Sequence, residues 1–364
     1  FTRGATIRYP TRMNGIIGTE MQGTPFSSPA ALRAAFDDGL NKLLRHDSLG
    51  AFVLVLANAS HEPSALDRLR APLAEAFAGW SARIDRRDPR ATDAARDDAE
   101  VFASLRRLGF ASLGVTRCRR LGPWELQFNR LRALRPPRLS STRVRQLYKP
   151  FDPEGFHFNK PFLRREVFWE GEFAGTPLRV FYNKFPFAEL HGLLVPDPQA
   201  NRPQFLDADT HALIWDLTEH LGQTLPGVGF GYNARGAYAS VNHLHLQMFM
   251  RSTGRYPVEA AQWVHNGGAE RYPLVVQRHV NCVGAWRSVA GLHASETSYN
   301  LLYRPGCLYI LPRAMQGSYA HSGWTGGFAW SEMAGAVTVF DPADFERLNR
   351  ADIDAELARL SVAR

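Results

Sequence analysis

The sequence predicts a duplicated α+β fold, with antiparallel sheets flanked by helices and a helical insertion. Three observations predict it. First, segments bounded by Gly and Pro between residues 123 and 200 have strand character, and a second β-rich block follows later in the chain. Second, apolar residues at 63–110 recur every three or four positions, as on amphipathic helices. Third, residues 182–196 and 302–312 share one outline, a strand, a turn and an apolar strand ending in Pro.

The N-terminal elements follow from hydrophobic spacing. Residues 31–45 have the period of a helix, whereas the apolar run at 51–57 predicts a buried strand. A helix is expected over 66–84, where Pro72 either kinks it or marks a new start. A second helix is expected over 101–108.

Gly, Pro and capping residues bound the later elements. Asp207 or Asp209 can cap a helix over roughly 210–223, and Pro305-Gly306 predicts the turn of a hairpin. Strands are expected at 166–169, 178–182, 192–195, 240–247, 272–276, 298–303 and 307–311, with a closing helix at 342–361. We interpret Trp124, Trp263 and Trp330 as core residues, and Arg304 and Arg313 as surface charges.

Composition narrows the class of protein. The 364 residues are 45% hydrophobic, which supports a sizeable core, and no run of about 18 apolar residues is available to cross a membrane. The start at Phe1 lacks both a signal-peptide core and an initiator Met, which leaves the true N-terminus open. The three cysteines are far apart, which argues against a disulfide framework or a cysteine-rich zinc site and predicts a cytoplasmic setting.

The net charge is +8, which suits an anionic partner. Ten Lys or Arg and one acidic residue, Glu125, lie between Arg117 and Lys149. This run predicts either an exposed arginine-rich surface or an electropositive wall beside a phosphate site. Zinc-finger spacing, an RRM signature and a long basic helix are all missing from the sequence, so a nucleic-acid partner is not expected.

The most informative segment runs from Ser240 to Gln247. His243, His245 and Gln247 occupy alternate positions between apolar residues, which predicts that they share one face of a strand. Each buried polar group needs a partner, so a core face is rarely built in this way. The row therefore predicts a functional site.

A neutral imidazole can attack phosphorus, and its pKa of about 6.5 leaves it largely unprotonated at neutral pH. The reaction also needs donors for the non-bridging phosphate oxygens. The glycine-containing segment at 229–240 can supply backbone N–H groups, and Asn233 and Ser240 add side-chain donors. Two other interpretations of the histidines stay open, as metal ligands or as paired structural residues.

The segment from Ser240 to Gln247 resembles the active-site strand of the histidine-triad superfamily. It is most similar to the branch with Gln in the third position, which holds galactose-1-phosphate uridylyltransferase, diadenosine tetraphosphate phosphorylase and the GDP-hexose phosphorylases. The upstream segment 182–196 resembles that superfamily's strand pair. The GDP-L-galactose/GDP-D-glucose phosphorylases match best, and the resemblance covers about residues 123–340. The stretches that carry it are Gly231–Gln247, Gln127–Asn129, Arg143-Val144, Lys149–Asp152 and Phe158–Lys160.

The resemblance implies roles for individual residues. His245 would be the nucleophile, His243 would lie beside it, and Gln247 would hydrogen-bond the phosphate. Because glutamine cannot protonate a leaving group, Gln247 favours transfer to an acceptor over hydrolysis. His191 matches a mostly structural histidine.

The remaining roles concern substrate binding. By the resemblance, Asn233 and Ser240 would bind α-phosphate oxygens, and Asn183 would contact the nucleotide ribose. Lys160 is either a phosphate contact or a surface lysine. The zinc of some uridylyltransferases uses cysteine ligands that this sequence lacks, so neither a metal nor another cofactor is predicted.

The resemblance implies a nucleotidyltransferase that phosphorolyses a nucleoside diphosphate hexose, with inorganic phosphate as acceptor. Alternatives are a dinucleoside polyphosphate phosphorylase, a hexose-1-phosphate nucleotidyltransferase, and a non-enzymatic nucleotide-binding module. Relatives often pair two protomers, which makes a homodimer an expectation. We expect a catalytic half at 1–255, containing the insertion at 63–110, and a degenerate second half at 256–364 without His-x-His.

Overall fold

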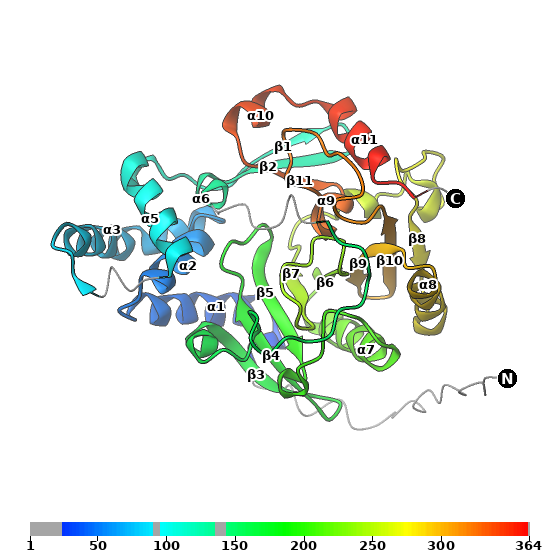
Figure 1. Cartoon of the computed structure of the whole chain (residues 1–364), viewed down its shortest axis with the longest axis horizontal. Helices are drawn as coiled ribbons and strands as arrows, with labels where there is room; N and C mark the ends of the chain where they lie inside the picture. The colour runs from blue at the N-terminus through cyan, green and yellow to red at the C-terminus, as the bar shows by residue number, and fades with distance from the viewer. Residues whose placement is uncertain (1–23, 90–94, 135–142, 363–364) are drawn as a thin grey trace.

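The chain is described here by a computed structural model that covers residues 24–89, 95–134 and 143–362. Its centre is an eight-stranded sheet in which all neighbouring strands are antiparallel (Figure 1). In spatial order the strands are β3 (Val167–Phe173), β4 (Thr176–Tyr182), β5 (Glu189–Pro196), β7 (Leu246–Met250), β6 (Val228–Asn233), β9 (Ser298–Arg304), β10 (Cys307–Arg313) and β8 (Gln277–His279).

A second sheet contains β1 (Arg117–Leu121), β2 (Trp124–Phe128) and β11 (Ala336–Val339). β1 and β2 are antiparallel, whereas β11 runs parallel to β2. The prediction of an α+β fold with antiparallel sheets flanked by helices is confirmed, with this one parallel pair added. Both sheets combine strands from before and after residue 255, and the division there stays a prediction.

Four helices form a helical block at one side of the central sheet (Figure 1). They are α1 (Pro29–Leu44), α2 (Leu49–Ala59), α3 (Pro63–Asp85) and α5 (Arg96–Leu108). Three of these helices were predicted, and Pro72 lies inside the uninterrupted α3 rather than at a new start. The strand predicted at 51–57 is wrong, because this apolar run is the helix α2, whose residues except Gly50 are all buried. A helix buried on all sides has no polar face, so its periodicity is hidden.

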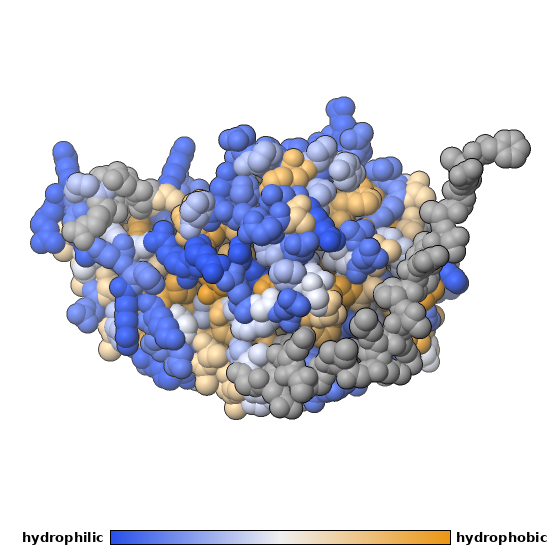
Figure 2. Space-filling model, turned by 90° about the horizontal axis from the view of Figure 1, so that it is seen from below, coloured by the Kyte–Doolittle hydropathy of each residue, from blue (hydrophilic) through white to orange (hydrophobic). Residues whose placement is uncertain are grey.

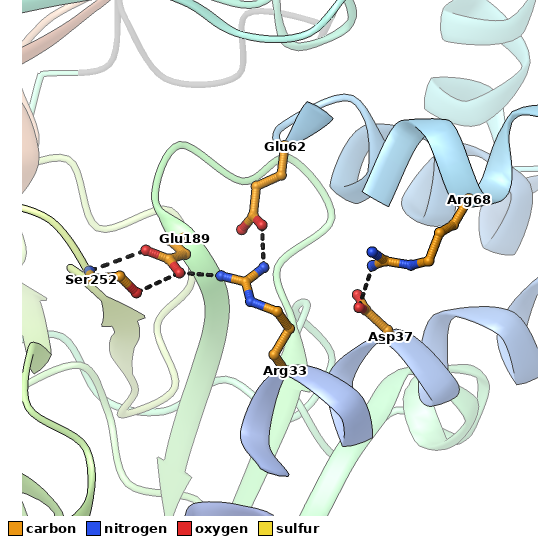
Figure 3. Close-up of polar contacts among 6 residues, drawn as sticks. All are labelled: Arg33, Asp37, Glu62, Arg68, Glu189 and Ser252. Atoms are coloured by element: carbon orange, nitrogen blue, oxygen red, sulfur yellow. Dashed lines mark hydrogen bonds and ion pairs between the residues drawn. The ribbon is translucent and has the colours of Figure 1, made fainter. Parts of the chain in front are cut away.

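Ion pairs join the helical block to the central sheet (Figure 3). Arg33 of α1 donates to Glu62, which precedes α3, and to Glu189 at the start of β5. The Glu189 carboxylate also accepts from the backbone N–H of Ser252 at 3.1 Å and from its hydroxyl at 2.6 Å. One guanidinium therefore links two helices to the strand that carries His191.

Helices α7 (Ala208–Thr224) and α8 (Cys282–Ala294) pack on the part of the sheet around β6, β9 and β10. The carboxylate of Asp207 accepts from the backbone N–H of Thr210, so the predicted cap of α7 is confirmed. The hairpin of β9 and β10, with its turn at Pro305-Gly306, is also confirmed. The strand expected at 272–276 is wrong, since β8 begins only at Gln277.

The remaining helices are short. The single helix predicted at 342–361 is wrong, because the segment forms two helices, and Asn349 caps the second of them. The elements are α6 (Arg130–Ala133), α9 (Trp330–Met333), α10 (Pro342–Arg347) and α11 (Arg350–Arg359), with 3-10 helices at Pro25–Ser27, Phe110–Ser112, Pro161–Glu166, Pro198–Ala200, Pro257–Glu259 and Val264–Asn266.

The three tryptophans predicted to lie in the core are buried there. Trp124 and Trp330 are 0% exposed and Trp263 is 1% exposed. The outer face shown in Figure 2 is mainly hydrophilic, with apolar patches scattered over it. Among the described residues, no helix is both long enough and apolar enough to cross a bilayer.

Candidate active site

The histidine segment leads into β7, which begins at Leu246. Only Gln247 of the predicted row lies on the strand, so the prediction that both histidines are strand residues is wrong. The reason lies in the backbone bonds of His245, whose N–H and carbonyl both bond the side-chain amide of Gln204, at 2.9 and 3.1 Å. A side chain thus takes the place of a neighbouring strand, and both imidazoles turn into the protein, where His243 is 1% and His245 is 5% exposed.

The imidazole of His245 is held in one orientation. Its Nδ1 atom lies 2.8 Å from the backbone carbonyl oxygen of His243. A carbonyl only accepts, so this bond assigns the proton to Nδ1 and leaves the lone pair on Nε2. Burial lowers the pKa of His245 to about 4, so the ring is neutral at pH 7.

His243 anchors an aromatic segment over this site. Its Nδ1 accepts from the backbone N–H of Phe158 at 3.1 Å, and the ring of Phe151 lies 5.3 Å from its own. The Phe158 ring also lies 5.1 Å from that of His245. Burial, together with the neighbouring His245, lowers the pKa of His243 to about 4. His243 therefore fixes the wall against which the second histidine packs.

The side-chain oxygen of Gln247 receives two donors. The indole N–H of Trp330 donates at 2.9 Å, and the Nε2 atom of His191 lies 3.2 Å away. The other nitrogen of His191 accepts from the backbone N–H of Phe187 at 3.3 Å, which places the His191 proton on Nε2. The amide NH2 of Gln247 has no partner among the described residues, so it is the end able to donate to an anion.

Asn233, the last residue of β6, is held in the same way. Its side-chain oxygen accepts from the Nδ2 of Asn300 at 2.7 Å and from the backbone N–H of Trp330 at 2.9 Å. Within the described parts of the chain, its NH2 group has no protein acceptor. Gln204 also donates to the backbone carbonyl of Asn233 at 3.0 Å, which links β6 to the histidine segment.

Asn183 follows β4 and lies beside the same group. Its Nδ2 atom is 3.2 Å from the Nε2 of His191, and its oxygen accepts from the backbone N–H of Phe185 at 3.1 Å. Burial drives the pKa of His191 well below its usual range, so His191 stays neutral. Asn183 and Gln247 thus both lie next to the Nε2 atom of His191, whose proton is directed to the Gln247 oxygen.

Two predicted site residues lie outside this hydrogen-bonded group. Ser240 is exposed. Lys160 donates from its amine to the carbonyls of Pro153 and Glu154, at 3.2 and 3.5 Å. Lys160 is two residues from Phe158, which places it at the edge of the site rather than against the histidines.

Residues that the sequence analysis missed complete the arrangement. Gln204 gave no sequence signal, because its role depends on a segment about forty positions later. Asn300 is a polar residue in the middle of an apolar strand, which was a usable signal. Arg313 is 0% exposed and donates to Asn300 at 3.4 Å and to the hydroxyl of Tyr319 at 2.8 Å, so its interpretation as a surface charge is wrong.

Arg304 is not a free surface charge either. Its side chain is 10% exposed and pairs with Glu259 at 3.0 Å. Of the basic run, Arg117 and Arg119 lie on β1 and contact α10 through Glu346. At this end of the run the arginines thus contact α10, the electropositive wall stays a prediction, and residues 135–142 lie outside the described residues.

Neither a cluster of metal ligands nor either of two surface cavities marks the histidines in the described part of the chain. The described residues contain no group of three or more His, Cys, Asp or Glu side chains able to hold a metal ion. Two surface cavities, of about 450 and 390 Å³, lie beside the three-stranded sheet, and neither His243 nor His245 lines them.

Comparison with known proteins bears out the resemblance found in the sequence. The family model described as "GDPGP1-like, N-terminal domain" matches residues 124–249, which include the whole histidine segment. GDP-D-glucose phosphorylase 1 of Macaca fascicularis is 38% identical over 118 residues, 30% of each chain, and that of Homo sapiens is 37% identical over 118 residues, again 30% of each. The chain thus spans about 30% of the length of these curated relatives.

Solved structures with a similar arrangement come from yeast. The Ap4A phosphorylase Apa2 in complex with Ap4A has a TM-score of 0.49 and 15% sequence identity, covering 74% of this chain and 99% of that one. The AMP complex of the same protein has a TM-score of 0.46 and 16% identity, covering 68% and 89%.

Proposed function

We propose that this chain is a nucleotidyltransferase that works through a covalent nucleotidyl-histidine. Its reaction is phosphorolysis of a nucleoside diphosphate hexose, with a GDP-hexose as the first candidate. The products are the nucleoside diphosphate and a hexose 1-phosphate. The observation that carries the proposal is the bond from His245 Nδ1 to the His243 carbonyl, which leaves a neutral Nε2 as the nucleophile.

The reaction has two displacements at the same phosphorus. In the first, a bond forms between His245 Nε2 and the α-phosphorus, the bond to the bridging oxygen breaks, and hexose 1-phosphate leaves. In the second, an oxygen of inorganic phosphate attacks the α-phosphorus, the N–P bond breaks, and nucleoside diphosphate is released. The first step leaves the nucleotidyl group on His245, the second step regenerates the neutral imidazole, and neither step needs a metal-bound nucleophile.

The two amides beside His245 support stabilisation of the phosphate. The side-chain oxygens of Gln247 and Asn233 already accept two donors each, so both groups present NH2 to a ligand. Fixed donors aimed at developing charge stabilise a transition state without reorganising. A leaving hexose 1-phosphate is a stable anion, so it needs little of the protonation that an amide is unable to give.

The relatives support the choice of substrate. Relatives that match part of the chain are named GDP-D-glucose phosphorylase 1, and the matching family model spans the histidine segment. To test this choice, the protein is incubated with each member of a panel of nucleoside diphosphate hexoses and with inorganic phosphate. The release of nucleoside diphosphate is then measured. We expect a GDP-hexose to react fastest, and no turnover of any member would refute the proposal.

A second experiment tests the intermediate itself. The protein is incubated with substrate and no phosphate, then digested and analysed by mass spectrometry. We expect a nucleotidyl adduct on the peptide that contains His245. An adduct that persists in His245→Ala would show that the nucleophile is another residue.

A further inference from the structure

We infer that Trp330, from the C-terminal part of the chain, is a positioning residue that sets the orientation of both substrate-facing amides. It touches Gln247 through its indole N–H, at 2.9 Å, and Asn233 through its backbone N–H, at 2.9 Å. One residue therefore binds two side chains that lie on different strands, β7 and β6. The inference rests on the proposed function only where it assigns the ligand as an anionic phosphate.

The chemistry of the two contacts fixes which end of each amide faces the ligand. An amide has one accepting oxygen and one donating NH2, and the two ends exchange by a rotation of 180°. Both contacts of Trp330 are donors, so each one selects the oxygen. The NH2 groups of Gln247 and Asn233 then face away from Trp330, and a phosphate oxygen can accept from them.

Packing holds Trp330 in place. The indole is 0% exposed and stacks on Phe249 with ring centroids 4.9 Å apart and an interplanar angle of 17°. Gly231 makes room for it, because a Cβ there would come within 2.3 Å of the indole carbon Cδ2. The Glu332 carboxylate accepts from the backbone N–H of Ala329 at 3.0 Å, which caps the turn that begins at Trp330.

A second line of contacts supports Asn233 from the same side. Asn300 donates to the Asn233 oxygen at 2.7 Å, and its own oxygen faces Arg313 at 3.4 Å. Arg313 is buried, and its guanidinium lies 5.0 Å from the ring of Tyr238. The C-terminal part thus supplies the donors that orient the site, although it lacks a His-x-His of its own.

The first test needs no substrate. Nuclear magnetic resonance can follow the exchange of the Trp330 indole proton with solvent in the wild type and in Gln247→Ala. We expect the substitution to shift this resonance and to speed its exchange, while the indole proton of Trp263, which donates to the Pro257 carbonyl at 2.6 Å, stays unchanged. An unchanged Trp330 signal would overturn the inference.

The second test compares two matched variants. Trp330→Phe keeps an aromatic ring to stack on Phe249 but loses the donor to Gln247. Trp263→Phe is the control, because Trp263 is also buried, stacks on Trp124 at 5.5 Å and donates one bond, yet has no described contact with Gln247 or Asn233. The two variants should lower the free energy of unfolding by similar amounts. Only Trp330→Phe should also lower kcat, by about fivefold, with little change in KM.

A double-mutant cycle completes the test. If Trp330 acts through Gln247, Trp330→Phe should have little further effect on kcat in the Gln247→Ala background. Equal effects of Trp330→Phe in both backgrounds, or equal loss of kcat in the two tryptophan variants, would overturn the inference. Failure of the wild type on every nucleotide would instead refute the proposed function, and the exchange experiment would still decide the role of Trp330.

Discussion

The Nδ1 atom of His245 lies 2.8 Å from the backbone carbonyl oxygen of His243. A residue two positions away thus sets the tautomer of the proposed nucleophile through its main chain, while its own side chain holds Phe158. His243 thus has two separate roles, one for its main-chain carbonyl at His245 and one for its side chain at Phe158. Replacing the His243 side chain would leave the carbonyl in place. This separation gives the first prediction.

His245→Ala should abolish the nucleotidyl adduct and lower kcat by at least about a thousandfold, because it removes the attacking nitrogen. His243→Ala should lower kcat less, since the carbonyl that fixes Nδ1 remains. Steady-state kinetics and mass spectrometry of the adduct measure both effects. His220→Gln on α7 is the control and should keep wild-type kcat. Equal loss in the two active-site variants would show that the His243 side chain takes part directly in the chemistry.

Gln247→His should shift the products toward hydrolysis. A histidine there can protonate a leaving group or activate water, which an amide is unable to do. We expect the ratio of nucleoside monophosphate to diphosphate to rise by about tenfold, as measured by chromatography at saturating phosphate. Gln247→Asn is the matched control: it also loses the contacts of the longer side chain but adds no proton donor, so the product ratio should stay low. A rise of the same size in Gln247→Asn would contradict this explanation.

Candidate residues and elements were easiest to predict where the sequence signal was local. The alternation of His243, His245 and Gln247 lies within five residues, and the hairpin of β9 and β10 is marked by its own turn. Elements with clear periods or boundaries, such as α3 and α7, were located for the same reason. Local spacing therefore gave the candidate residues before their surroundings were known.

What the sequence could not provide depends on distant contacts. The backbone of His245 leaves the strand because a side chain about forty residues upstream, Gln204, bonds both its N–H and its carbonyl. Trp330 meets Asn233 across 97 residues, and no local pattern encodes that contact. The apolar run of α2 has no polar face, so strand and helix were indistinguishable by period.

The stability of the fold should decrease as the pH falls from about 6.5 toward 4. Burial lowers the pKa of several histidines to about 4, namely His61, His211, His243, His245 and His293. Below pH 6.5 the unfolded chain binds protons that the folded chain does not, so each group destabilises the fold by at most about 1.4 kcal/mol per pH unit. Above pH 6.5 these histidines are neutral in both the folded and the unfolded chain, so they cause no such loss.

Urea unfolding followed by circular dichroism at pH 7.5, 6.0 and 5.0 measures this loss. Buried carboxyls with a raised pKa act in the opposite direction, so the total should be smaller than the sum over the histidines. His293→Gln should reduce the pH dependence, whereas substitution of the exposed His46 by Gln should leave it unchanged. A free energy of unfolding that is constant over this range would contradict the prediction.

Arg33→Gln should loosen the helical block from the central sheet. The change leaves the carboxylates of Glu62 and Glu189 without the guanidinium that joins them (Figure 3). The three side chains are 21–34% exposed, so solvent screens both ion pairs of Arg33. We therefore expect a loss of about 1 kcal/mol in the free energy of unfolding. The loss should shrink in 1 M NaCl, since salt screens the same charges.

Arg68→Gln is the matched control for this change. Arg68 pairs with a single carboxylate, Asp37 of α1, it is 49% exposed, and the pair stays within the helical block (Figure 3). Chemical denaturation should therefore show a smaller loss than for Arg33→Gln. Hydrogen exchange should separate the two variants further, because only Arg33→Gln should speed exchange at the backbone N–H of Ser252, which the Glu189 carboxylate accepts at 3.1 Å. Faster exchange at Ser252 in both variants, or in neither, would show that Arg33 does not join the block to the sheet.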